Sequence, residues 1–334
     1  MRGAGVKRRE FMGLLGSAAV LPFAARAQSD RTRRIGMLMA YAASDPEAQL
    51  FVRAFVQALS ESGWTDGKNL QIDFRWAAGD VEQMRVHAKQ LVAANPDMIV
   101  ANTSPVTAAL HRETRTIPIV FVIASDPVGD GFIESLARPG GNITGFIQTE
   151  ASMGGKLLEL LKEAAPQVRR AALIFNPHTA AGGGNYFRPS FEAAARTLAV
   201  QPIVSPVHND ADIETAIAAL AREPGGGLVV MSDPFTRVHR GPIIALAAQH
   251  KVPAVHPTRI FALDGGLVAF GPSNADLFRR APSYVDRILR GASPADLPVQ
   301  VPTKFELVVN VRAAKELSLE IPPSVLVRAD EVIE

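Results

Sequence analysis

Short apolar runs alternate with amphipathic segments along most of this chain, and this alternation constrains its fold more than any other feature. The run at residues 35–40 is followed by residues 50–59, where apolar side chains recur every three or four positions, as on one face of a helix. Further strand-length runs lie at residues 70–76, 98–101, 117–124 and 143–147. This alternation predicts a parallel sheet with helices on both faces. Residues 70–76, where apolar and polar positions alternate, are expected to form an edge strand.

The same pattern begins again after the helical segment at residues 153–165. Residues 33–38 (RRIGML) are echoed by residues 169–174 (RRAALI), and a Ser-Asp-Pro turn follows an apolar run in each half. Without residues 1–27 the 334-residue chain still has 307 residues, more than one hydrophobic core usually serves. The predicted fold class is therefore α/β, with two Rossmann-like lobes of parallel sheet joined by a multi-strand hinge.

Glycine- and proline-rich segments suggest where the chain crosses between the lobes. Residues 138–142 (RPGGN) and 265–272 are the expected crossing points, and a cleft should lie between the carboxyl ends of the two sheets. We assign residues 28–145 and about 272–302 to lobe one, residues 146–271 to lobe two, and residues 303–334 to a C-terminal return segment across the hinge.

The N-terminus has the three parts of a secretory signal peptide. Lys7, Arg8 and Arg9 precede an apolar run from Phe11 to Ala25, and Ala25-Arg26-Ala27 supplies the small residues of a cleavage site. The paired arginines resemble a twin-arginine export signal, and a Sec-type signal is the alternative. No apolar run reaches the roughly eighteen residues of a membrane-spanning helix. We expect residues 1–27 to be removed and the mature protein to be soluble in the periplasm.

The composition of the mature chain argues against a nucleic-acid partner. Residues 1–27 hold five of the 35 Lys and Arg and one of the 33 Asp and Glu, so their removal leaves 30 basic and 32 acidic residues. The basic character thus belongs to the signal peptide, and electrostatic support for nucleic-acid binding disappears with it. Cysteine is absent, which excludes disulfides and a lipid-anchored cysteine.

Polar and small residues follow the apolar runs, at the positions where open parallel sheets bind their ligands. Hydroxyls just before expected helix N-termini favour a carboxylate, and the two aspartates are candidates for pairing with an ammonium group. Ordinary turn and N-cap chemistry is the alternative interpretation of both Ser-Asp-Pro turns. The candidate ligand-binding residues are Tyr41, Asn102, Thr103, Ser104, Ser125 and Asp126 in lobe one and Asn176, Ser232, Asp233, Phe235 and His256 in lobe two.

The sequence lacks the signatures of the common catalytic and cofactor sites. Residues 182–184 (GGG) have neither the Lys-Ser/Thr of a phosphate loop nor dinucleotide spacing, and a flexible surface loop is expected there. The seven histidines show no metal-ligand spacing, and no Gly-x-Ser-x-Gly elbow is present. We expect no cofactor, no metal and no enzymatic activity.

Two long segments carry the most specific motifs in the chain. They are residues 117–145, with IPIVF, DPVG and ARPGGNITG, and residues 276–331, with DLFRR, YVDRIL, PTKFEL and RADE. Both resemble the ABC transporter substrate-binding protein family, whose studied members include tryptophan-binding and related aromatic amino-acid-binding lipoproteins. The resemblance extends over about residues 34–334 and implies the periplasmic-binding-protein type I fold, with three crossings and closure over a ligand. The chain departs from the family pattern at Asn102-Thr103-Ser104 and at residues 182–184, so tryptophan or tyrosine is not carried over as the ligand.

The function implied is that of the periplasmic substrate-binding component of an ABC importer. It would bind an amino acid or a related small organic compound and deliver it to an inner-membrane permease with a separate ATPase, itself acting as a monomer. A periplasmic receptor that signals to a membrane protein is the alternative. A transcription regulator of the same fold would need a DNA-binding helix pair where the signal peptide stands, and a secreted α/β enzyme would need a nucleophile or metal cluster.

Overall fold

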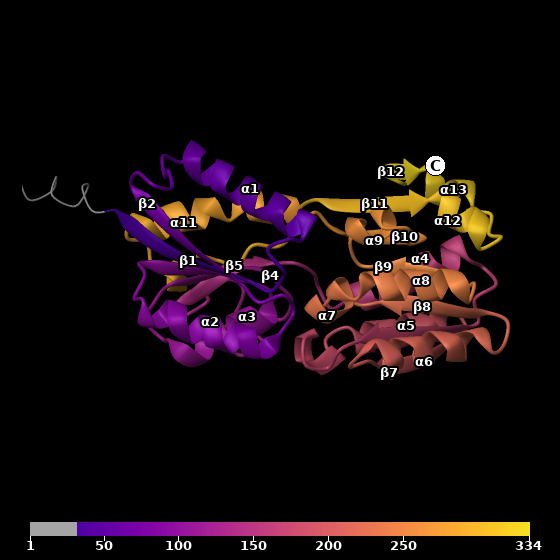
Figure 1. Cartoon of the computed structure of the whole chain (residues 1–334). Helices are drawn as coiled ribbons and strands as arrows, with labels where there is room; N and C mark the ends of the chain where they lie inside the picture. Colours follow the sequence, from indigo (N-terminus) through magenta and orange to yellow (C-terminus); the bar gives the residue numbers. More distant parts are fainter. Residues whose placement is uncertain (1–31) are drawn as a thin grey trace, which may run out of the picture.

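A computed structural model describes residues 32–334, which form two lobes side by side (Figure 1). The expected signal peptide, residues 1–27, and its expected cleavage site lie outside the described residues. One lobe is built on a five-stranded sheet and the other on a seven-stranded sheet. All neighbouring strands are parallel except one pair in the larger sheet, so the predicted α/β class with two sheets is confirmed. No helix among residues 32–334 is long and apolar enough to cross a bilayer.

The five-stranded sheet has the order β2-β1-β3-β4-β5, with β2 at the edge as the sequence predicts. Helices α1, α10 and α11 pack together on one face, while α2 and α3 pack on the other (Figure 1). The strands are β1 (Arg33–Met39), β2 (Leu70–Trp76), β3 (Met98–Asn102), β4 (Ile119–Ala124) and β5 (Ile143–Ile147), and the helices are α1 (Pro46–Glu61), α2 (Val81–Ala93), α3 (Ser104–Glu113), α10 (Asn274–Arg280) and α11 (Pro282–Leu289).

Helix α1 illustrates why these segments fold as they do. The Asp45 carboxylate caps its N-terminus by accepting from the Ala48 N–H at 2.8 Å, and Pro46 occupies the first turn. The buried side chains Phe51 and Phe55 are four residues apart and therefore share one face. Phe51 stacks on Phe278 of α10 at 5.0 Å, which places the C-terminal helices α10 and α11 in the core of lobe one.

The seven-stranded sheet has the order β12-β11-β10-β9-β8-β6-β7, and β11 runs antiparallel to β10. Helices α4 and α5 cover one face, and α6 and α8 cover the other. The strands are β6 (Arg170–Phe175), β7 (Gln201–Pro206), β8 (Gly226–Val230), β9 (Ala254–His256), β10 (Val268–Pro272), β11 (Phe305–Asn310) and β12 (Glu331–Ile333). The helices are α4 (Met153–Ala164), α5 (Arg188–Thr197), α6 (Asp210–Ala221), α7 (Pro234–Val238), α8 (Arg240–Gln249), α9 (Arg259–Leu263), α12 (Val311–Glu316) and α13 (Pro323–Leu326), with the 3₁₀ turn η1 (Ala181–Gly184). The 3₁₀ turn η2 (Pro294–Asp296) instead packs on β5 of the five-stranded sheet.

The chain passes between the lobes after β5, after β10 and before β11. The first and last of these segments lie together, because the Gln300 N–H donates to the Gly145 carbonyl and the Ile147 N–H donates to the Gln300 carbonyl, both at 2.9 Å. Glycine is required here by close packing. A Cβ on Gly145 would lie 2.0 Å from the Phe121 carbonyl oxygen, and one on Gly271 would lie 1.8 Å from that of Pro257.

The C-terminal segment differs from the expectation of a separate return path over residues 303–334. Only a few residues before Phe305 bridge the lobes, and β11 and β12 then form one edge of the seven-stranded sheet (Figure 1). Apolar residues such as Leu307 and Val309 are buried in the lobe-two core, which explains why the segment joins that sheet. Residues 305–333 therefore belong to lobe two in this structure.

Candidate functional site

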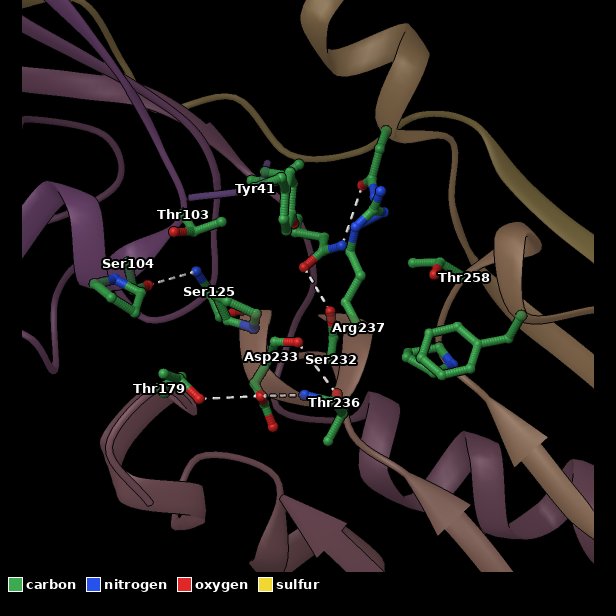
Figure 2. A pocket seen from close by; sticks show the side chains of 18 residues that line it. Tyr41, Thr103, Ser104, Ser125, Thr179, Ser232, Asp233, Thr236, Arg237 and Thr258 are labelled. Carbon is green, nitrogen blue, oxygen red and sulfur yellow. Dashed lines mark hydrogen bonds between the residues drawn. The ribbon is translucent and has the colours of Figure 1, made fainter. Parts of the chain in front are cut away.

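A narrow cavity lies between the lobes, where the carboxyl ends of the two sheets face each other (Figure 2). Its free volume is about 20 Å³, which admits one water molecule or little more. Six of the eleven candidate residues line it: Tyr41, Thr103, Ser104 and Ser125 from lobe one and Ser232 and Asp233 from lobe two. The strand-end rule thus located the cavity.

The lobe-one wall is formed by two strand ends with unusual backbone conformations. Thr103, which follows β3 and precedes α3, has a φ of +78°, and Ile123 near the end of β4 has a φ of +58°. Such angles are strained for β-branched residues and occur mostly at functional sites. The Ser104 hydroxyl accepts from the Ser125 N–H at 3.1 Å and joins the two strand ends (Figure 2). The wall is therefore a rigid, polar surface at the N-terminus of α3.

Three buried polar groups that line the cavity have no hydrogen-bond partner among the described residues. They are the hydroxyls of Thr103 and Thr258 and the Nε–H of Arg237. Each residue is at most 5% exposed. Buried polar groups are nearly always paired, so these three groups mark positions where a bound molecule would complete the hydrogen bonding.

An ion cluster closes one side of the cavity. It is formed across the cleft by Arg237 of α7 with Asp45 and Glu47 at the start of α1. Arg237 Nη2 lies 2.8 Å from Asp45 Oδ1, and Arg237 Nη1 also pairs with Glu47. The guanidinium lies 4.1 Å from the centre of the Tyr41 ring, in cation–π geometry (Figure 2). The lobes are thus joined by charge pairing that is largely removed from solvent.

The cluster changes the titration of its members. Burial opposes ionisation of Asp45, but the neighbouring Arg237 outweighs it, so the pKa of Asp45 is lowered. Burial dominates at Glu47 and raises its pKa despite the same guanidinium. Burial also raises the pKa of Tyr41 to about 12, so this phenol stays neutral.

Asp233 lines the cavity, but its carboxylate is occupied by neighbours in lobe two. Oδ1 accepts from the Thr179 hydroxyl at 3.0 Å and from the Thr236 N–H at 2.9 Å, and Oδ2 accepts from the Asn176 N–H at 3.2 Å. The Phe235 N–H donates to the same carboxylate. Burial raises the pKa of Asp233 to about 6 in spite of these donors. Since a carboxylate offers about four acceptor positions, little capacity remains for a ligand ammonium group.

The other five candidates do not line the cavity. Asp126 is half-buried and accepts from the Gly129 N–H at 2.9 Å, as a turn residue does, so the two aspartates do not face each other across the cleft. Asn102 accepts from the Ala40 N–H at 3.1 Å, and Asn176 accepts from the His178 N–H at 2.8 Å. Phe235 stacks on His239, away from the lining. The two asparagines and Asp126 thus bind backbone N–H groups of their own lobe.

His256 is enclosed in lobe two, where its ring stacks on Phe261 at 4.9 Å. It is 1% exposed, and both ring nitrogens lack partners among the described residues. Burial lowers its pKa to about 3, so the ring is neutral. No group of three His, Asp or Glu residues within residues 32–334 is placed to hold a metal ion.

Three lining residues that follow strands were not predicted: Gln148, Thr258 and Asn274. Gln148 and Asn274 lie in the crossing segments after β5 and β10, whereas Thr258 follows β9 within lobe two, so the strand-end rule extended to these strands would have found them. Ser232 donates to Gln148 Oε1 at 2.7 Å, and Gln148 Nε2 donates to Asn274 Oδ1 at 3.1 Å. This chain of amides links the lobe-two wall to the hinge. Residues 182–184, expected as a flexible loop, form the 3₁₀ turn η1, and its first residue, Ala181, lines the cavity.

Comparison with known proteins agrees with this architecture. Residues 39–333 match the family model described as ABC transporter substrate binding protein. The chain is 26% identical over 274 residues to a tyrosine-binding protein of Clostridioides difficile (strain R20291), which covers 80% of this chain and 76% of that protein. An ABC domain in complex with L-Trp from Streptococcus pneumonia has a TM-score of 0.83 and 25% identity, covering 90% of this chain and 100% of that one.

A ligand-free, open structure of a substrate-binding protein with adhesive properties from Clostridium difficile has a TM-score of 0.66 at 24% identity, covering 90% of this chain and 99% of that one. At nearly equal identity and coverage, the TM-score is higher with the L-Trp complex than with the open structure. The fold is that of the type I periplasmic binding proteins. The match over nearly the whole described chain shows that this protein belongs to the ABC transporter substrate-binding protein family.

Proposed function

We propose that the protein serves an ABC importer by holding an amino acid or a related small polar compound between its lobes and releasing it to a permease. The observation that carries the proposal is the interlobe cavity, in which the groups on Thr103, Thr258 and Arg237 lack partners among the described residues. These groups come from both lobes, so a ligand completes its contacts only when the lobes are together. Closure on the ligand then supplies the conformational signal for a membrane permease.

The N-terminus of α3 suits a carboxylate on that ligand. The Thr103 hydroxyl, unpartnered within the described chain and 4% exposed, stands at the N-cap position of α3, and the hydroxyls of Ser104 and Ser125 line the same wall. A helix N-terminus offers free N–H groups and a positive dipole end, and both favour an anion. The carboxylate therefore belongs on the lobe-one side of the cavity.

We further propose that the chain reaches the periplasm through its N-terminal signal and is cleaved after Ala27. The twin basic residues before an apolar run and the Ala25-Arg26-Ala27 site support this. N-terminal sequencing of protein from the periplasm should find Gln28 first. Uncleaved protein confined to the cytoplasm of a host with a working twin-arginine pathway would contradict it.

A thermal-shift screen followed by calorimetry tests the function. A ligand that binds only the folded state must raise the melting temperature of the mature protein. For the ligand found, Thr103→Val should reduce the affinity about tenfold, because a hydrogen bond to a charged group contributes about 1.5 kcal/mol. Thr215→Val, at an exposed position of α6, is the control and should leave the affinity unchanged.

Valine keeps the branched shape of Thr103 and removes a hydroxyl that has no partner among residues 32–334. The unfolding free energy of the free protein should therefore change little. Equal affinity of Thr103→Val and the parent would place the ligand elsewhere. If no small polar compound stabilises the protein, the proposed function is wrong.

A further inference from the structure

The aromatic rings that line the cavity already have a stacking partner. The lining includes two such rings, Tyr41 and Phe261. The Arg237 guanidinium covers Tyr41 at 4.1 Å, and the His256 ring is stacked on Phe261 with an interplanar angle of 18°. An aromatic ligand gains much of its affinity by stacking on rings of the protein. On the face of Tyr41 that Arg237 covers, it would have to displace the guanidinium.

Arg237 is poorly placed to move aside. Its side chain is 6% exposed and is held by Asp45 and Glu47 of the opposite lobe. A ring laid on Tyr41 would drive the guanidinium away and leave the two carboxylates unpaired in a partly buried site. The same displacement would break the charge pairing that joins the lobes, so it opposes the closure on which binding depends.

The remaining lining is polar and the space is small. The hydroxyls of Thr103, Ser125, Ser232 and Thr258 face a free volume of about 20 Å³. The chain as a whole superposes, with a TM-score of 0.83, on a relative whose complex contains L-Trp. Arg237 is one of the side chains that occupy the space between the lobes.

We propose that Arg237 is a specificity-determining residue that excludes aromatic amino acids and restricts the site to small, non-aromatic, polar carboxylates such as short hydroxy acids or the smallest polar amino acids. This inference rests on the proposed function, because it concerns the ligand of the same cavity. The ligand class that it assigns to this chain differs from the tyrosine and L-Trp that appear in the names of two relatives.

The test compares two matched panels on the mature parent protein by thermal shift and calorimetry. The small panel is glycine, L-serine, L-threonine, glycolate and L-lactate, and the aromatic panel is L-phenylalanine, L-tyrosine and L-tryptophan. We expect at least one member of the small panel to bind at least tenfold more tightly than every member of the aromatic panel. Aromatic binding as tight as that of the small panel would overturn the inference and leave the proposed function standing. Failure of both panels would overturn the inference, whereas the wider thermal-shift screen decides the proposed function.

The variant Arg237→Ala tests the residue itself. Truncation uncovers the Tyr41 ring and enlarges the cavity, so the ratio of aromatic to small-panel affinity should rise at least tenfold. Arg240→Ala is the matched control, because Arg240 also pairs with Asp45 (3.6 Å) but does not line the cavity. An unchanged ratio in folded Arg237→Ala, or an equal rise in Arg240→Ala, would show that Arg237 does not set specificity. If Arg237→Ala fails to fold, Arg237→Met keeps the apolar stem, and the panel comparison on the parent decides the ligand class independently.

Discussion

Through its carboxylate, Asp233 joins the start of α7 to the loop after β6 at the wall of the cavity. The strand-end rule predicts its place at the cavity, but sequence does not reveal that Thr179, Asn176 and Thr236 converge on its carboxylate. Two of these donors lie more than fifty positions away in the chain, so the bonds depend on the tertiary fold. The alternative interpretation, helix capping, describes the geometry better than ammonium pairing does.

Asp233→Ala is therefore expected to destabilise the protein. Removing a buried acceptor leaves several buried donors without a hydrogen-bond partner, which should lower the unfolding free energy by roughly 2–4 kcal/mol in a denaturant melt. Asp126→Ala is the control, since this half-buried aspartate accepts one backbone bond and should cost less than about 1 kcal/mol. If Asp233→Ala melted like the parent yet lost ligand binding, Asp233 would be a ligand contact after all.

His256 should make the protein sensitive to acid. Burial lowers its pKa to about 3, while in the unfolded chain the ring titrates near 6.5. Between these values the unfolded state binds a proton that the folded state does not, so the unfolding free energy falls as the pH drops, by about 1.4 kcal/mol per unit. This contribution is fully present above about pH 6.5.

Denaturant melts of the parent and His256→Leu at pH 7 and 4.5 measure the effect. The parent should lose roughly 2–3 kcal/mol more than the variant between the two values. His208→Leu, which removes an exposed histidine, should track the parent. Parallel pH curves for the parent and His256→Leu would mean that the buried ring is charged in the folded state or that acid opens its surroundings.

Among the elements, the parallel strands could be predicted from the sequence, whereas the place of the C-terminal strands β11 and β12 in the larger sheet could not. Apolar runs of strand length fix β1, β3, β4, β6 and β8, because buried parallel strands must be apolar along their whole length. The antiparallel pairing of β11 with β10 joins segments that are separated by two helices of the other lobe. No local pattern specifies such a partner, so residues 303–334 were assigned to the hinge.

The same dependence on contacts between distant segments explains which residues of the cavity lining could be predicted from the sequence. Residues that follow a central strand, such as Thr103 and Ser232, were accessible to the strand-end rule. Arg237 was not, because it reaches the cavity from within the short helix α7 and meets carboxylates of the other lobe. Predicting it would require the relative position of the two lobes.

Close backbone packing at the hinge strands gives a prediction for Gly271. A Cβ added there would lie 1.8 Å from the carbonyl oxygen of Pro257, a backbone atom directly after β9, so the backbone itself would have to shift. Gly271→Ala should therefore lower the unfolding free energy by about 1–3 kcal/mol, as overpacking usually does. Gly241→Ala is the control: a Cβ added to this residue of α8 meets open space, and alanine favours helix by about 0.5–1 kcal/mol. Equal melting of the two variants would contradict the packing argument.

At the scale of the whole molecule, the ion cluster of Arg237, Asp45 and Glu47 links the lobes independently of any ligand. The double variant Asp45→Asn with Glu47→Gln removes both charge pairs while keeping side-chain shapes, and asparagine preserves the cap of α1. Arg237 then remains buried without a counter-ion in the closed form. Breaking a buried pair in this way costs about 3–5 kcal/mol.

That penalty falls on the closed state, because the open state returns Arg237 to water. Solution scattering should therefore show a larger radius of gyration for the ligand-free double variant than for the ligand-free parent. Ligand binding must then restore the closed form, and the affinity should fall by a factor on the order of a hundred, at about 1.4 kcal/mol per tenfold. Glu163→Gln breaks the exposed pair with Arg328 inside lobe two and should alter neither quantity. An unchanged radius and affinity in the double variant would mean that the hinge strands alone hold the lobes together.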